Sequence, residues 1–368
     1  MTPGGLADEV ARLAAAAGCD PQRVTDPVTV REQWNCAALI LLDVDAARAT
    51  AGADLPRRDG VVIVSADGDP DVWRSAVAVG AQHVAVLPDA EAWLVGALAD
   101  AVESPAEPGR VLAVLGGRGG AGASVFATAV AVAVAEAGRH AMLVDCDALG
   151  GGLDLVLGAE KMTGLRWSGL ALGGGRVPAA ALHAALPTPR VGGRGGLTVL
   201  SHGRSDHGRP DHGRRSDSGE DGPGPDGVAV RTVCLVGRRA GETVVCDVPR
   251  HPCEAGTAAL ESADLAVLIV PAEVRACAAA ATVAARVRRH GVAVQLVVRG
   301  PAPGGITPTD ISRALDLPLI AAMRPQPGLA AALDRGVVPG RSRGPLAAAA
   351  CQVLAVLDDS SRLQGVAA

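Results

Sequence analysis

The stretch that decides the fold is Val111-Leu-Ala-Val-Leu-Gly-Gly-Arg-Gly-Gly-Ala-Gly-Ala-Ser124. An apolar run typical of a buried strand breaks into five glycines, and a long Ala/Val segment typical of a helix follows Ser124. The glycines let the backbone turn sharply and aim successive N–H groups inward, while the helix contributes its positive N-terminal end. This order predicts a strand, an anion-binding loop and a helix, with the Ser124 hydroxyl where such loops hold Mg²⁺.

The loop resembles a known phosphate-binding motif. The residues Gly117-Arg118-Gly119-Gly120-Ala121-Gly122-Ala123-Ser124 are similar to the deviant Walker A loop, G-K-G-G-x-G-K-[ST], of the MinD/ParA ATPases. Arg118 stands at the signature position, whose residue in the family reaches the nucleotide of the partner subunit, and Ala123 stands at the P-loop lysine. Lys161 is the only lysine in the chain, so no shifted alignment restores either lysine.

The resemblance extends beyond the loop. The form G-G-x-G-A-S resembles the CpaE/TadZ branch of the family, which positions pili and septa, and the chain apart from one insertion resembles the septum site-determining proteins of actinobacteria. This likeness implies an α/β protein with a receiver-like (flavodoxin-like) N-terminal domain and a MinD/ParA-like P-loop domain with a mostly parallel sheet. It also implies that residues 117–124 bind ATP with Mg²⁺ and that the protein is a homodimer.

Two further apolar strands end in carboxylates. The segment 141–147 delivers Asp145 and Asp147 to a strand end, where open α/β sheets place their sites. In the family this V-D-x-D is the switch I region, and the residue that matches Asp147 helps to orient the attacking water, which makes Asp147 a candidate catalytic residue. The segment 243–247 resembles a Walker B strand, which implies that Asp247 and Ser124 hold Mg²⁺. A solvated strand end is the alternative interpretation of each carboxylate.

Loss of both lysines weakens the expected chemistry. A cation beside the β/γ oxygens is commonly worth a few kcal/mol, or ~10²–10³ in rate. We therefore expect weak binding of Mg-ATP and turnover near background. The alternative is a working ATPase in which Arg118 replaces lysine, because arginine can pair with phosphate in a bidentate manner. Arg299 stands where MinD-like proteins tend to carry an Asn that reads adenine, so the sequence leaves the base preference open.

The N-terminal part alternates helix-like and strand-like segments, with helices expected near 6–17, 71–79 and 91–102 and strands at 37–43, 61–65 and 83–87. It resembles a response-regulator receiver, in which Asp43 would be the phosphoacceptor and Ser65 the switch hydroxyl. Leu87 occupies the position of the receiver lysine, and the strand with the acidic pair is absent. We therefore expect a pseudo-receiver used for docking. A phosphorylated switch is the alternative.

The domain limits follow from composition. We expect the pseudo-receiver at 1–103, a Pro-containing linker at 104–110, the P-loop domain at 111–358 and a C-terminal tail at 359–368. A Gly/Pro/Asp/Arg/Ser-rich stretch at about 201–227 should be a disordered insertion. An Ala/Val/Leu helix expected at 346–357 lacks the basic stripe of a membrane anchor, so no direct membrane contact is expected.

Composition narrows the class of protein. Hydrophobic residues make up 49% of the chain and aromatic residues only 1%, so its cores must be built from Ala, Val and Leu. A formal charge of −5 argues against a specific nucleic-acid partner. The eight cysteines form no C-x-x-C pair and are expected to be reduced thiols of a cytoplasmic protein.

Two classes of function remain open. One is a positioning factor with little or no hydrolysis that contacts division machinery, or alternatively pilus or secretion machinery, and is recruited to septum or pole through these partners. The other is an active ATPase switch. A phospho-dependent response regulator is a weaker third interpretation, because the receiver lysine is missing.

Overall fold

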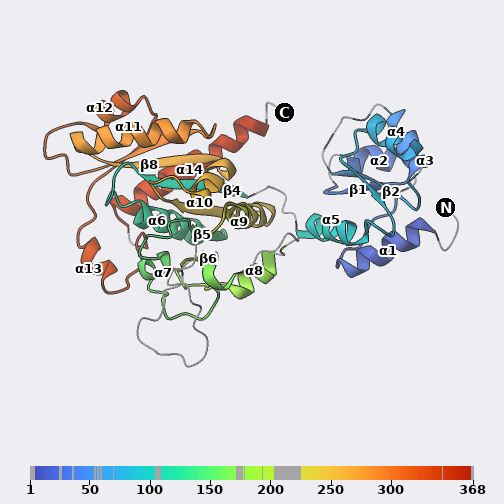
Figure 1. Cartoon of the computed structure of the whole chain (residues 1–368), viewed down its shortest axis with the longest axis horizontal. Helices are drawn as coiled ribbons and strands as arrows, with labels where there is room; N and C mark the ends of the chain where they lie inside the picture. The colour runs from blue at the N-terminus through green and yellow to red at the C-terminus, as the bar shows by residue number, and fades with distance from the viewer. Residues whose placement is uncertain are drawn as a thin grey trace, which may run out of the picture. The chain divides into compact units, whose positions relative to one another are not determined.

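A computed structural model describes residues 5–24, 27–34, 37–53, 55, 58, 60–68, 70–103, 109–170, 177, 179–192, 194–202, 225–341 and 343–365. The chain divides into two compact units, Met1–Ala106 and Glu107–Ala368. Figure 1 draws the smaller unit in blue and cyan, and the larger one in colours that run from teal through green to red. Both units contain parallel sheets with helices, which confirms the predicted α/β class.

The smaller unit is built around a three-stranded parallel sheet in the order β1-β2-β3. Alternate residues of β2 face opposite sides, so both faces of this strand are covered by helices and all five of its residues are buried. Helices α1 and α5 cover one face, while α2, α3 and α4 cover the other. The bounds are α1 Leu6–Ala16, α2 Pro27–Trp34, β1 Ile40–Leu42, α3 Val44–Ala51, β2 Val61–Ser65, α4 Pro70–Val79, β3 His83–Val86 and α5 Glu91–Glu103.

Helices α2 and α3 are additions to the elements expected from the sequence. Both are short, and α2 carries several polar residues, so neither shows a clear apolar period. Helix α3 begins where the sequence predicted the end of a strand, because the Asp43 carboxylate accepts a hydrogen bond from the Ala46 N–H at 2.7 Å and caps the helix. Local capping therefore decides the structure around Asp43.

The larger unit contains a seven-stranded, fully parallel sheet in the order β10-β9-β8-β4-β7-β5-β6. Strand β4 lies at its centre, between β8 and β7. The strands are β4 Arg110–Gly116, β5 Ala141–Asp145, β6 Leu197–Leu200, β7 Thr243–Val248, β8 Leu265–Pro271, β9 Val294–Arg299 and β10 Leu319–Met323. The helices are α6 Ala123–Glu136, α7 Leu153–Val156, α8 Ala179–Ala185, α9 Gly227–Arg239, α10 Glu254–Ser262, α11 Val274–Arg288, α12 Pro308–Leu315, α13 Leu329–Leu333 and α14 Pro345–Gly365.

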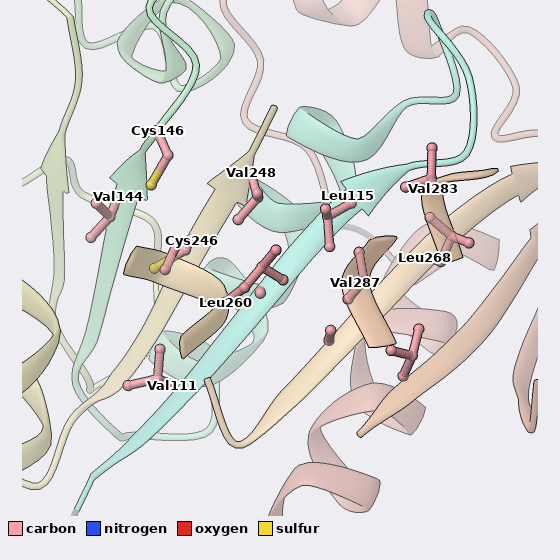
Figure 2. Close-up of a cluster of buried hydrophobic side chains, with 14 of the residues drawn as sticks. Val111, Leu115, Val144, Cys146, Cys246, Val248, Leu260, Leu268, Val283 and Val287 are labelled. Carbon is pink, nitrogen blue, oxygen red and sulfur yellow. The ribbon is translucent and has the colours of Figure 1, made fainter. Parts of the chain in front are cut away.

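The two faces of this sheet carry different helices. Helices α6 and α14 pack against one face, and α9 to α12 pack against the other. Figure 2 shows the second core, in which Val111 and Leu115 of β4 lie among aliphatic side chains and the buried thiols of Cys146 and Cys246. The loop after β4 leads to α6, whereas the loops after β7 and β8 lead to helices of the opposite face. Such a divergence at the carboxyl ends of neighbouring strands is where open α/β sheets bind ligands.

Several expected domain limits need correction. Ser201, placed at the start of the insertion at 201–227, is fully buried, and Asp226 caps α9 by accepting a hydrogen bond from the Ala229 N–H at 2.6 Å. Arg110, placed in the linker, begins β4, and the expected tail at 359–368 overlaps α14, which ends at Gly365. Composition missed these limits because Ser201 and Arg110 are held by partners far away in the chain, Asp145 and Glu242, while Asp226 is held by the helix that it caps. The rest of the insertion, 203–224, lies outside the described residues.

Within the residues that the structure describes, none of the helices combines the length and the apolar character that a membrane crossing requires.

Replacing Phe126 of α6 by Ala should destabilise the larger unit. Phe126 is fully buried, and every residue of α6 from 126 to 135 is buried, so the vacated volume cannot be filled by solvent-exposed neighbours. We expect a loss of about 3–5 kcal/mol, equivalent to roughly 10 °C in melting temperature, measured by calorimetry. The control Val274→Ala, at a site that is 71% exposed, should cost less than about 0.5 kcal/mol. Equal losses in the two variants would contradict the burial of α6.

Candidate functional site

The glycine-rich loop leaves the carboxyl end of β4 and enters α6 at Gly122. The Gly117 N–H continues the pairing with β8 by donating to the Ile269 carbonyl at 2.8 Å, and the Ala121 N–H donates back to the Arg118 carbonyl at 3.3 Å. Gly122 caps α6 with a φ of +91°, a left-handed conformation that favours glycine. The chain thus reverses within a few residues and leaves the first N–H groups of α6 without helical partners at the turn.

One side of the loop packs tightly and another is open. A Cβ on Gly117 would stand 2.8 Å from the Ala280 Cβ of α11, so the loop can approach this helix closely only with glycine there. A Cβ on Gly119 or Gly120 would meet no atom within 4 Å. The open side leaves room for an anionic group beside the loop, as an anion-binding loop requires.

Ser124 and Asp247 meet beside this loop. Ser124 is the second residue of α6, and its hydroxyl lies close enough to the Asp247 carboxylate of β7 to lower the pKa of that group. Strand β7 pairs directly with β4, and Asp247 is the register partner of Val114. The two predicted Mg²⁺ ligands are therefore neighbours, and both are oxygen donors of the kind that Mg²⁺ prefers.

The negative charge of the site is concentrated on buried strand ends. Asp145 of β5 and Asp247 of β7 are register partners, and both are almost completely buried. Burial raises the pKa of Asp247 to about 7; the nearby Ser124 hydroxyl opposes this rise, and the charges of Asp145 and Asp147 add to it. Burial also raises the pKa of Asp145. A bound cation would favour the ionised forms of these groups.

Asp145 is held by a network that the sequence did not reveal. Its carboxylate accepts hydrogen bonds from the Ser201 hydroxyl at 3.1 Å, from the Leu153 N–H at 3.2 Å and from the Asp147 N–H at 3.1 Å. The indole N–H of Trp167 donates to the Asp145 carbonyl at 2.7 Å. Asp145 therefore fixes the segment that follows β5. The position of Ser201 directly after an apolar strand is the one signal that could have indicated this role.

Asp147, the predicted catalytic residue, lies half-buried just beyond β5. Its carboxylate accepts a hydrogen bond from the Leu149 N–H at 3.1 Å, and its charge acts on Asp247. The structure thus places Asp147 near the Ser124–Asp247 pair. Its role toward a water molecule stays a prediction.

Arg118, predicted to reach across a subunit interface, is paired within the chain. Its Nη2 donates to the two carboxylate oxygens of Glu273, at 2.9 and 3.0 Å. Glu273 is the N-cap residue of α11, so this ion pair ties the loop to the start of that helix. Both side chains are somewhat more than a third exposed, and an ion pair of that exposure contributes only about 0–1 kcal/mol. A stronger partner could therefore displace Glu273.

The residues of the smaller unit that match receiver positions make local hydrogen bonds or pack in the core. Asp43 caps α3, and the Ser65 hydroxyl donates to the Asp67 carbonyl at 2.6 Å. Leu87, at the position of the receiver lysine, is buried in the core. Phosphorylation of Asp43 would have to break this helix cap, and the docking role of the unit stays a prediction.

Replacing Asp247 by Asn should stabilise the metal-free protein at pH 8 and do so much less at pH 5. The pKa of Asp247 is raised from 3.8 to about 7 on folding, so the folded protein holds a proton that the unfolded chain releases. The stability from this proton is complete below about pH 4 and is lost as the pH rises through 7. At pH 8 the buried charge costs up to a few kcal/mol, which Asn avoids.

The melting temperature of both proteins in EDTA, at pH 5 and pH 8, measures this effect. Asp45→Asn is the control, because the Asp45 side chain is 94% exposed and its replacement should leave both melting temperatures nearly unchanged. A difference between Asp247→Asn and the unmodified protein that is the same at both pH values would contradict the raised pKa.

Known proteins resemble the two units. The family model described as "Rv3660c-like, CheY-like N-terminal domain" matches residues 1–110. The cell division ATPase MinD of Pyrococcus furiosus superposes with a TM-score of 0.51 at 18% identity, over 67% of this chain and 99% of that protein. The septum site-determining protein MinD of Pyrococcus horikoshii, complexed with Mg-ADP, gives 0.50 at 18% identity, over 70% of this chain and 98% of that protein. These likenesses show the predicted receiver-like and MinD/ParA-like folds.

A full-length relative settles the family. The protein Rv3660c of Mycobacterium tuberculosis (strain H37Rv) is 44% identical over 363 residues, which cover 97% of this chain and 96% of that protein. The chain therefore belongs to the family of Rv3660c, and it joins a CheY-like N-terminal domain to a unit with the MinD/ParA fold.

Proposed function

We propose that this protein is a septum site-determining factor of the Ssd type, in which the MinD/ParA-like unit binds Mg-ATP weakly, hydrolyses it slowly or not at all, and marks a site for the division machinery. The observation that carries the proposal is that Ser124 and Asp247 lie next to each other beside an open glycine loop that lacks its lysine. The loop, Ser124 and Asp247 can still bind a metal nucleotide, whereas the lysine charge that would support catalysis is absent at Ala123. The solved relatives of the same fold are named as a cell division ATPase and a septum site-determining protein.

Within this proposal the loop backbone and the neighbouring polar side chains have separate roles. The backbone of residues 117–124 surrounds the phosphates, and Ser124 and Asp247 are the ligands of Mg²⁺, which neutralises phosphate charge when bound. Asp247 must lose its proton to bind the cation, and its pKa near 7 makes that loss easy at neutral pH. Asp147 lies close enough to influence this pair by its charge. The network around Asp145 keeps the segment between them in place.

The domain arrangement completes the proposal. The CheY-like domain serves as a docking module at 1–103, a linker follows, and the MinD/ParA-like domain runs from β4, which begins at Arg110, to the end of α14 at Gly365. In a nucleotide-bound homodimer, Arg118 exchanges Glu273 for the phosphates of the partner subunit, because a phosphate chain carries more charge than one carboxylate. Recruitment to septum or pole then depends on protein partners. The alternative client, pilus or secretion machinery, is favoured by one observation, the CpaE/TadZ-like form of the loop.

Titration with Mg-ATP tests the proposed binding site. We expect a dissociation constant in the micromolar range or weaker, and phosphate release near background, because Ala123 supplies no charge. Ser124→Ala should weaken binding at least ~10-fold, since it removes one metal ligand and one partner of Asp247. Thr232→Ala is the matched control, because that hydroxyl donates to the Val228 carbonyl within α9. Calorimetry measures the affinities, and vigorous hydrolysis by the unmodified protein would overturn the slow-factor proposal.

Freeing Arg118 from Glu273 should promote self-association. We expect Glu273→Gln to form a dimer at lower protein concentration in Mg-ATP than the unmodified protein, because the competing carboxylate charge is gone. Arg118→Ala should stay monomeric under the same conditions. Sedimentation velocity with and without Mg-ATP measures the difference, and Glu261→Gln, which loosens the exposed pair with Arg231, is the control.

The same variants test the cellular role. Excess protein should block septation and leave cells elongated, because a factor that hydrolyses ATP slowly is not cleared from its site. Arg118→Ala should relieve the elongation, whereas Glu261→Gln should not. If overproduced protein stays diffuse and cells divide at normal length, the septum role fails and the pilus or secretion role is the better one.

A further inference from the structure

Arg299 reaches the phosphate loop from a different strand. It is the last residue of β9, which is separated from β4 only by β8. Its Nη1 lies 3.2 Å from the point where a Cβ on Gly122 would stand. Gly122 caps α6 and directly precedes Ala123, the position without a lysine. The fold therefore brings a guanidinium group to the part of the loop that has lost its own cation.

The guanidinium of Arg299 has no partner among the residues that the structure describes. Its Nε is buried and makes no hydrogen bond, and no carboxylate of the described ranges forms an ion pair with it. Arg118 of the loop, by contrast, is paired with Glu273. A partly buried, unpaired cation is costly unless an anion joins it. The unpaired guanidinium of Arg299 therefore favours the binding of an anionic ligand.

The nature of that anion follows from the surroundings. The N–H groups at the start of α6, the open side at Gly119 and Gly120, and the Arg299 guanidinium belong to the same short loop region. Helix N-termini and arginines both favour phosphate, and arginine adds two parallel hydrogen bonds to its oxygens. A nucleoside polyphosphate fits this combination through its phosphate chain.

We propose that Arg299 is the phosphate-binding cation of this site and takes over, from strand β9, the charge that Ala123 does not supply. The inference rests on the proposed binding of nucleotide at the loop and adds to it the residue that determines affinity for the phosphates. Arg299 would contact the phosphate chain of the nucleotide and not its base.

Binding of Mg-ADP and of magnesium pyrophosphate to the full-length protein tests the proposal. Arg299→Ala should weaken both ligands about 10- to 100-fold, the usual value of a hydrogen-bonded charge. Pyrophosphate has no base, so an equal loss for both ligands locates the contact on phosphate. Arg299→Gln, which keeps most of the side-chain length, should show the same loss. Arg313→Ala on α12, 75% exposed, is the control and should bind like the unmodified protein.

A double variant that moves the positive charge from residue 299 to residue 123 gives a sharper test of the proposal. Ala123→Lys added to Arg299→Ala should recover most of the lost affinity, because it returns the cation to the loop itself. Melting temperatures without ligand show whether each variant is folded, and the ligand-induced rise in melting temperature gives a second readout.

The outcomes separate the two proposals. If the unmodified protein binds neither ligand, the proposed nucleotide function fails and this inference fails with it. If the unmodified protein binds both and the folded Arg299 variants bind them equally well, only the role of Arg299 is overturned. Loss of Mg-ADP binding with pyrophosphate binding unchanged would assign Arg299 to the nucleoside and would also overturn it.

Discussion

The burial of β4 and α6 on all sides is the constraint on which the larger unit depends. Strand β4 is covered by helices on both faces, and α6 is buried from residue 126 to 135, so neither element can bring side-chain chemistry to the surface. The loop that joins β4 to α6 is where this central strand–helix unit meets solvent, and the neighbouring strands end at the same edge of the sheet. The candidate ligands therefore come from the strand ends, from the loop itself and from the first turn of α6.

The charges at this edge are arranged in two sets. Asp145 and Asp247 are buried on adjacent strands, and their pKa values are raised because burial disfavours the charged form. The arginines lie at the loop, one paired with Glu273 and one next to Gly122. A site of this kind is electrostatically incomplete by itself. A divalent cation suits the carboxylates and a polyphosphate suits the arginines, which is why a metal nucleotide agrees with both sets.

Similarity to known proteins and the residues of the site support different conclusions about this protein. The identity to Rv3660c over nearly the whole length establishes the family, while the MinD structures, at 18% identity, establish the fold of the larger unit. The activity of those ATPases does not follow from the fold, because function depends on residues at the site. Here the loss of two lysines alters the site directly, and the proposal of a slow positioning factor rests on that difference.

The sequence by itself determined the strand–loop–helix order around 111–124, the α/β class and the strands that end in Asp145 and Asp247, because apolar periodicity and glycine clusters are local signals. Tertiary structure decided which of these residues meet. The pairing of Arg118 with Glu273, the bond from Ser201 to Asp145 and the approach of Arg299 to Gly122 all join segments far apart in the chain. Such contacts depend on strand order and on the packing of α6 and α11, and neither is encoded in a local pattern.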